Sequence, residues 1–100
     1  MRGTEVRDGA TGVPAAPVLV YWRPGCAYCA RLRWGLRRLK VATEELNIWI
    51  DPAAAAFVRS VNGGDETVPT VVVAGETLVN PTLRQVKREL ERQLLGPDTV

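Results

Sequence analysis

Two cysteines, Cys26 and Cys29, are the residues of this 100-residue chain best suited to covalent chemistry. They are its only cysteines and are spaced as Cys-x-x-Cys. A thiolate attacks a disulfide sulfur, and a second thiol nearby can release the mixed disulfide that forms. The spacing therefore predicts thiol–disulfide exchange, provided that the flanking elements expose one sulfur and shield the other.

The pair lies where an apolar strand is expected to turn into a helix. Residues 18–22, Val-Leu-Val-Tyr-Trp, are typical of a buried strand. A stripe of leucines at helical spacing follows, formed by Leu32, Leu36 and Leu39. Cys29 shares this inward stripe, whereas Cys26 falls at the helix start, where unpaired N–H groups and the helix dipole favour a thiolate. We predict Cys26 as the nucleophile, with a pKa below the ~8.5 of a free cysteine, and Cys29 as the resolving thiol.

Other uses of the pair need different partners. A structural disulfide is disfavoured because two cysteines without a visible export signal indicate a reducing compartment. A zinc site within the chain lacks ligands, because the sequence has no histidine and no third cysteine. A zinc or iron–sulfur site shared between two chains stays open, as does an inactive pair. We expect no metal and no bound cofactor.

Composition and charge narrow the partners and the location. Lys and Arg outnumber Asp and Glu by 13 to 11, for a net charge of +2, which indicates neither nucleic acid nor membrane. No apolar run approaches the ~18 residues of a membrane span, and the N-terminus lacks the apolar core of a signal peptide. We expect a cytoplasmic monomer.

The pattern along the chain predicts one α/β domain between two tails. We expect a flexible extension over residues 1–17, a domain over 18–95 and a tail over 96–100. Strands are expected at 18–22, 46–50, 68–74 and 77–79, and helices at 26–41, 52–61 and 81–95. Asp51 and Asn80, each followed by proline, are expected to cap the second and third helices. The order β-α-β-α-β-β-α predicts a four-stranded mixed sheet with three helices, the minimal thioredoxin-like architecture.

The exposed side of the first helix is strongly basic. It carries Arg31, Arg33, Arg37, Arg38 and Lys40 and no acid. These residues form either a solvated face or a docking patch for an acidic partner. Trp34 projects roughly opposite the leucine stripe, so we expect its ring to be exposed.

From residue 18 to about 95 the chain resembles the glutaredoxins. Arg23 precedes Cys26 by three residues, and Cys26-Ala-Tyr-Cys29 is similar to the family's Cys-Pro-Tyr-Cys. Thr67-Val68-Pro69 is similar to its Thr-Val-Pro, whose cis proline faces the active cysteine. Within the family, the stretches 57–70 and 78–83 look most like the mycoredoxins, actinobacterial glutaredoxins that use mycothiol.

The resemblance implies a redox enzyme without a bound cofactor. Cys26 would reduce mixed disulfides between proteins and a low-molecular-weight thiol, here mycothiol, with electrons from a separate reductase. Binding roles are implied for Arg23, Tyr28, Thr67, Val68, Pro69, Asn80 and Thr82. Val79-Asn80-Pro81-Thr82 replaces the Gly-Gly-Asp platform of glutathione-using members. A cis Pro69 would present the Val68 backbone to a substrate strand, although a trans strand-entry proline fits the residues equally well.

Two rival functions remain open at the level of sequence. One is a protein-disulfide donor, for example to ribonucleotide reductase, that thioredoxin reductase recharges. The other is a binding module without enzymatic activity whose cysteines hold a shared metal or nothing. The expected partners of the leading hypothesis are thiolated or disulfide-bonded proteins, a small thiol and a reductase.

Overall fold

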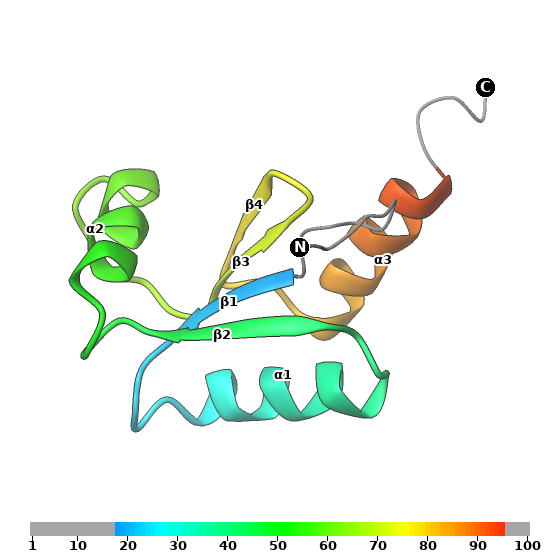
Figure 1. Ribbon diagram of the computed structural model, residues 1–100, viewed down its shortest axis with the longest axis horizontal. Helices are drawn as coiled ribbons and strands as arrows, with labels where there is room; N and C mark the ends of the chain where they lie inside the picture. Colours follow the sequence, from blue (N-terminus) through cyan, green and yellow to red (C-terminus); the bar gives the residue numbers. More distant parts are fainter. Residues whose placement is uncertain (1–17, 96–100) are drawn as a thin grey trace, which may run out of the picture.

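A computed structural model describes residues 18–95 (Figure 1). The predicted N-terminal extension and C-terminal tail lie outside the described residues. The elements are β1 (Val18–Trp22), α1 (Ala27–Arg38), β2 (Thr43–Asn47), α2 (Pro52–Val61), β3 (Thr70–Val73), β4 (Glu76–Val79) and α3 (Leu83–Leu95). This order confirms the predicted β-α-β-α-β-β-α arrangement.

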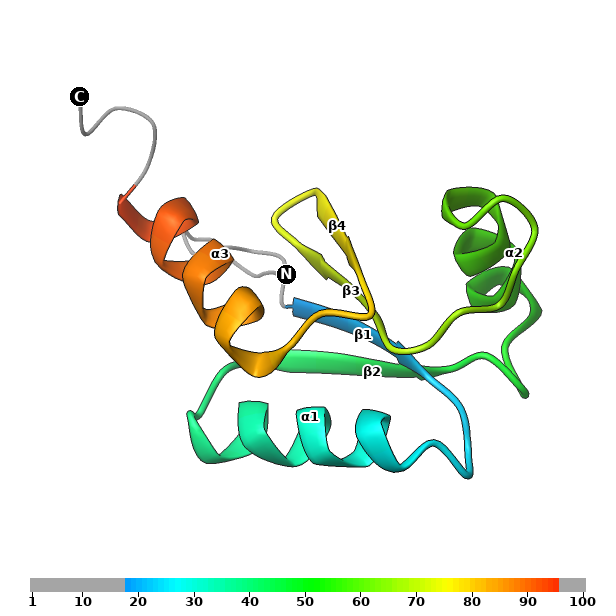
Figure 2. The ribbon, with the colours of Figure 1, turned by 180° about the vertical axis from the view of Figure 1, so that it is seen from behind.

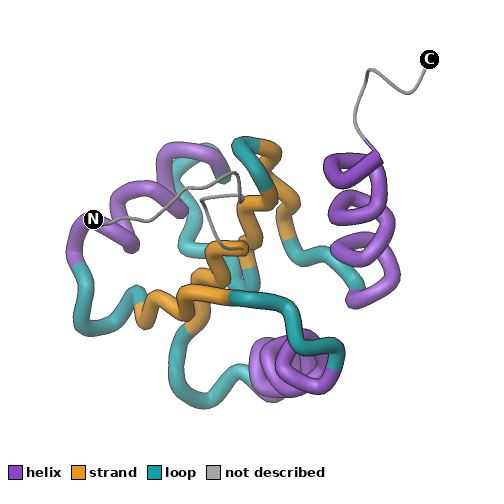
Figure 3. The backbone as a smooth tube through the Cα atoms, turned by 45° about the vertical axis from the view of Figure 1, so that its right-hand side comes forward, coloured by secondary structure: helices purple, strands orange, loops and turns teal. Residues whose placement is uncertain are grey.

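The four strands form one mixed sheet in the order β2-β1-β3-β4. β1 and β2 are parallel, whereas β3 is antiparallel to both β1 and β4. Figure 2 gives the same arrangement from behind, and Figure 3 shows the strands lying between α2 on one side and α1 with α3 on the other. The minimal thioredoxin-like architecture is therefore confirmed.

Alternating side chains of the central strands supply both cores. The core under α1 and α3 contains Val18, Val20, Leu32, Leu36, Val71, Val73 and Val86. The core under α2 contains Tyr21, Ile48, Ala54, Ala55 and Val58. A Cβ added at Gly35 would lie 2.8 Å from Leu83 Cδ2, so this glycine sets the close approach of α1 to α3. Both faces of β1 are covered, so its continuous apolar run correctly predicted a buried strand.

The second strand lies three residues earlier than predicted, at Thr43–Asn47 rather than 46–50. β2 is an edge strand, and edge strands carry charged side chains that an apolar-run criterion overlooks. Of the apolar residues that follow, Ile48 is buried in the core, but Trp49 and Ile50 stand 63% and 79% exposed in a turn.

Other boundaries also differ from the prediction. α1 ends at Arg38 rather than near residue 41, and Lys40 follows with a φ of 60°. β3 begins at Thr70 and ends at Val73 rather than spanning 68–74, and β4 begins one residue early, at Glu76.

The third helix begins later than predicted, because Thr82 rather than Asn80 caps it. The Thr82 hydroxyl accepts a hydrogen bond from the Gln85 N–H at 3.0 Å. The Gln85 side chain accepts one from the Thr82 N–H at 2.8 Å, completing a capping box. Asn80 instead has a φ of 52° and lies in the preceding turn. The predicted cap at Asp51 is confirmed, since its carboxylate accepts from the Ala54 N–H at 3.1 Å.

Candidate active site

The two cysteines occupy different positions at the start of α1. Cys26 is the N-cap, with extended backbone angles of −95° and 101°, and its Sγ accepts a hydrogen bond from the Cys29 N–H at 3.1 Å. Cys29 lies in the first turn and is 0% exposed, whereas Cys26 is half-buried. The two sulfurs are joined in a disulfide across a Cα–Cα distance of 5.2 Å. The predicted placement of the pair is therefore confirmed.

The electrostatic setting of Cys26 favours negative charge on sulfur. The first turn of α1 contains no acidic residue, and the Cys29 N–H already points at Sγ. A helix N-terminus carries a partial positive charge that stabilises anions within about one turn. Reduction of the disulfide would thus place a Cys26 thiolate in a site prepared for it.

The segment before β3 lies at the same edge of the sheet. Tyr21 pairs with Thr70, so Pro69 comes next to the last residue of β1, just before the loop to Cys26. Pro69 is buried, and the Val68–Pro69 peptide bond is cis. Within residues 18–95, neither backbone group of Val68 has a hydrogen-bond partner.

Two hydrogen bonds fix this segment in place. The Thr70 hydroxyl donates to the Thr67 carbonyl at 2.8 Å, and the Asn80 N–H donates to the Pro69 carbonyl at 2.8 Å. The segment that contains Thr67, Val68 and Pro69 is thereby tied to the end of β4. The backbone of Val68, which has no hydrogen-bond partner within residues 18–95, is consequently held in place by its neighbours.

Tyr28 joins the redox helix to the β4–α3 connection. Its hydroxyl donates to the Pro81 carbonyl at 2.9 Å, although the two residues are 53 positions apart in the chain. The structure thus brings Tyr28 together with the predicted segment at Asn80 and Thr82. Arg23 behaves differently, because its guanidinium donates to the neighbouring Pro24 carbonyl at 3.2 Å.

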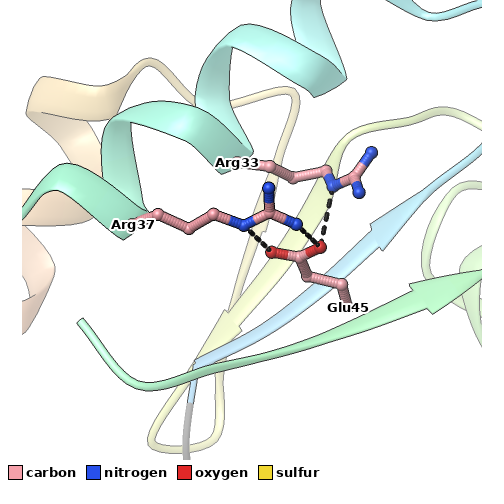
Figure 4. Close-up of polar contacts among 3 residues, drawn as sticks. All are labelled: Arg33, Arg37 and Glu45. Atoms are coloured by element: carbon pink, nitrogen blue, oxygen red, sulfur yellow. Dashed lines mark hydrogen bonds and ion pairs between the residues drawn. The ribbon is translucent and has the colours of Figure 1, made fainter. Parts of the chain in front are cut away.

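An ion-pair network beside the site was missed by the sequence analysis (Figure 4). Arg33 Nε lies 2.9 Å from Glu45 Oε1, and Arg37 contacts the same carboxylate at 2.6 and 3.1 Å. Burial raises the pKa of Glu45, but hydrogen bonds from Arg37 and Arg33 outweigh burial and hold it below its ordinary value. Two of the predicted basic residues are therefore anchored to β2 rather than simply solvated.

The same network reaches the strand that leads to Cys26. The Arg33 guanidinium lies 3.8 Å from the ring centroid of Trp22, the last residue of β1. The Trp22 indole N–H is buried and has no hydrogen-bond partner within residues 18–95. On the outer side of α1, Trp34 is 57% exposed, as predicted, and Arg38 covers one face of its ring at 4.7 Å.

Comparison with known proteins assigns the family. The glutaredoxin family model matches residues 18–78. This chain belongs to the glutaredoxin family. It is 46% identical over 76 residues to a Mycobacterium tuberculosis protein assigned as a glutaredoxin, covering 75% of this chain and 90% of that protein.

Solved glutaredoxin structures agree with this assignment. The crystal structure of a glutaredoxin from Archaeoglobus fulgidus has a TM-score of 0.64 and 26% identity, covering 85% of this chain and 99% of that one. The solution structure of a glutaredoxin from Brucella melitensis has a TM-score of 0.59 and 26% identity, covering 79% and 86%.

The glutaredoxin assignment and the Cys26–Cys29 pair together make this protein a glutaredoxin-like thiol–disulfide oxidoreductase. Residues 18–95 contain no group of three or more His, Cys, Asp or Glu side chains placed to hold a metal ion. They also contain no helix that is long and apolar enough to cross a membrane.

Proposed function

We propose that this glutaredoxin reduces mixed disulfides between proteins and mycothiol through Cys26. The observation that carries the proposal is the unequal setting of the two sulfurs. Cys26 caps the helix and is half-buried, and Cys29 is fully buried behind it. A substrate disulfide therefore meets Cys26 first, in the position where negative charge is stabilised.

The reaction proceeds by two exchanges that each conserve electrons. In the mixed disulfide, the Cys26 thiolate attacks the sulfur that belongs to the small thiol. A disulfide between Cys26 and the small thiol forms, and the thiolate of the substrate protein leaves and takes up a proton. A second molecule of the small thiol then attacks the small-thiol sulfur of that intermediate. The Cys26 thiolate is released, and the small thiol leaves as its own disulfide, which a separate reductase reduces.

The neighbouring residues supply binding groups for this substrate. We assign the unpaired backbone of Val68 to pairing with the substrate's backbone, in a segment that Thr67 and Pro69 hold in place. Tyr28 closes the side of the site towards Pro81. Arg23, half-buried in the loop before Cys26, is assigned to supporting the thiolate or an acidic substrate group.

The preference for mycothiol rests on the connection between β4 and α3. The Asn80 N–H is bonded to Pro69, the Thr82 N–H is bonded to Gln85, and Pro81 has no N–H. These three residues therefore offer a carboxylate no backbone donor, which weakens an anchor that suits glutathione. The exposed Asn80 amide and the Thr82 hydroxyl, which keeps its own proton to donate, suit the hydroxyl groups of a sugar-bearing thiol.

The test compares two mixed disulfides of one peptide, made with mycothiol and with glutathione. We expect kcat/KM for the mycothiol form to be at least about tenfold higher. A glutathione carboxylate would find no backbone donor at residues 80–82, and losing a hydrogen bond to a charged group typically costs on the order of 1.5–3 kcal/mol. Asn80→Ala and Thr82→Val should narrow that ratio, and Thr77→Val on the neighbouring strand serves as the matched control. Equal kcat/KM values for the two thiols would reject mycothiol preference and leave the family activity standing.

The bonded pair also favours a second candidate, a protein-disulfide donor. In that cycle Cys29 attacks the mixed disulfide on Cys26, the substrate thiol leaves, and the Cys26–Cys29 disulfide remains to be reduced. Rapid reduction of that disulfide by thioredoxin reductase and NADPH, without any small thiol, would favour this route.

A further inference from the structure

The turn between β2 and α2 exposes two large apolar side chains next to each other. Trp49 is 63% exposed and Ile50 is 79% exposed, the two highest values among the large hydrophobic residues in the described part of the chain. Single exposed apolar residues are common and need no explanation. An adjacent pair of this size on one short turn is less common and needs an explanation. We name this pair the Trp49–Ile50 tip.

The tip is held in a fixed shape by Asn47. The Asn47 side-chain oxygen accepts from the Trp49 N–H at 2.9 Å. Its backbone carbonyl accepts from the N–H groups of Ile50 at 3.2 Å and Asp51 at 3.1 Å. Asp51 then caps α2. Because the backbone of the tip is already ordered, the tip itself loses little conformational freedom when a partner binds.

The tip lies at the same edge of the sheet as the redox disulfide. β1 and β2 are parallel, so their C-terminal ends lie together, and the Ile48 N–H donates to the Trp22 carbonyl at 2.9 Å. Trp49 directly follows one end of this bond, and the loop to Cys26 directly follows the other. In Figure 1 the β1–α1 and β2–α2 connections both lie on the left side of the molecule, where the first turns down to α1 and the second turns up to α2. A polypeptide joined to Cys26 and extended along this edge would run towards the tip at about 3.3 Å per residue.

We propose that the Trp49–Ile50 tip docks the apolar segment beside the modified cysteine of a target protein. This inference rests on the proposed function, because it names the partner of the same site. The Asp51 carboxylate accepts a hydrogen bond at the α2 N-terminus, and the two side chains that form the tip itself are apolar. Two side chains bury far less than the ~1,200 Å² of a stable protein interface, which disfavours a second copy of this chain. They suffice to orient a partner that is held transiently by a disulfide.

The test compares the wild type with the double variant Trp49→Ser/Ile50→Ser on two substrates. Each substrate is a mixed disulfide made with the small thiol whose mixed disulfides the wild type reduces. One substrate is a decapeptide whose central cysteine is flanked by leucine and phenylalanine, and the other is cysteine alone. We expect kcat/KM for the peptide to fall at least about fivefold and that for cysteine to change less than about twofold, because only the peptide reaches the tip. Trp34→Ser is the matched control, an exposed tryptophan on the outer side of α1, and should change neither value.

A second readout does not depend on turnover. In the Cys29→Ser protein with the apolar peptide trapped on Cys26, the indole N–H resonance of Trp49 should shift and that of Trp34 should stay in place. An unshifted Trp49, or equal loss of kcat/KM on both substrates, would overturn the docking surface. A wild-type dimer that the double variant abolishes would also overturn it, in favour of a second copy. A wild type inactive on every mixed disulfide would instead reject the proposed function.

Discussion

The helices α1 and α2 begin in the same way but with a different capping atom. Each N-cap has an extended backbone, and each accepts a hydrogen bond at 3.1 Å from the N–H three residues later. In α2 the acceptor is the carboxylate of Asp51, whereas in α1 it is the sulfur of Cys26. The residue that donates is buried in both, at Ala54 and Cys29.

This comparison shows how an ordinary structural device becomes a reactive one. A carboxylate cap carries its charge permanently and serves stability. A sulfur cap carries charge only after the disulfide is reduced, so the same donor and dipole then favour the thiolate. Substitutions at the two caps should therefore have opposite profiles, with activity lost at one and stability lost at the other.

The largest effect is expected from Cys26→Ser. Serine is a favoured N-cap residue, so the fold should persist. A hydroxyl, however, does not attack a disulfide at neutral pH. We expect turnover of every mixed disulfide to fall by more than about a thousandfold. Thermal denaturation serves as the control for folding. Residual turnover near the wild-type level would mean that Cys26 is not the nucleophile.

Cys29→Ser should separate the two routes. Turnover of a small-thiol mixed disulfide should stay within about threefold of wild type, because Cys26 alone performs both exchanges. Reduction of an intramolecular protein disulfide should be abolished. A mass spectrum of the variant should show the small thiol bound to Cys26. A variant inactive towards both substrates would rule out the single-cysteine route.

Asp51→Ala tests the other side of the comparison. Loss of the cap should lower the free energy of unfolding by about 1 kcal/mol, measured by urea denaturation. Turnover of small mixed disulfides should stay at the wild-type level, since Asp51 caps α2 rather than the redox helix. Asp65→Ala, at an exposed position beyond α2, is the control for a general loss of charge. Unchanged stability would show that the carboxylate cap contributes nothing.

A smaller, pH-dependent effect is expected from Glu45→Gln. Since the pKa of Glu45 is below its ordinary value of 4.5 in the folded protein, its contribution is present above that pH and is lost as the pH falls through the folded-state pKa. At pH 7 the variant should lose about 1 kcal/mol of unfolding free energy. At pH 3 the difference from wild type should shrink. Glu44→Gln, on the exposed side of β2, is the control, and a gap that stays constant with pH would contradict the ion-pair account.

Local signals allowed much of the site to be predicted from sequence. Three predictions depend only on neighbours in the chain, and each was correct: the position of the cysteine pair, the strand β1 and the start of α2 at Asp51-Pro52. Asn80 was misassigned as a cap because Asn is the stronger N-cap residue and proline follows it, whereas the reciprocal bonds with Gln85 make Thr82 the cap.

Features that join distant segments could not be predicted. The Tyr28–Pro81 bond and the Arg33–Glu45–Arg37 network depend on how α1 lies against other elements. The prediction for β2 was shifted because one of its charged residues, Glu45, is paired with Arg33 and Arg37, which an apolar pattern does not reveal. Apolar patterning alone therefore predicted the strand at residues 46–50 rather than at Thr43–Asn47.

The most direct test of the account is the alkylation of reduced protein as a function of pH, with each label located by mass spectrometry. The sulfur cap of α1 predicts that Cys26 reacts faster than Cys29 at neutral pH, with an apparent pKa below the ~8.5 of a free cysteine. Cys29, which is fully buried, should react slowly and only at higher pH. Equal reactivity of the two sulfurs at neutral pH, or faster reaction at Cys29, would contradict the central claim that the helix cap makes Cys26 the nucleophile.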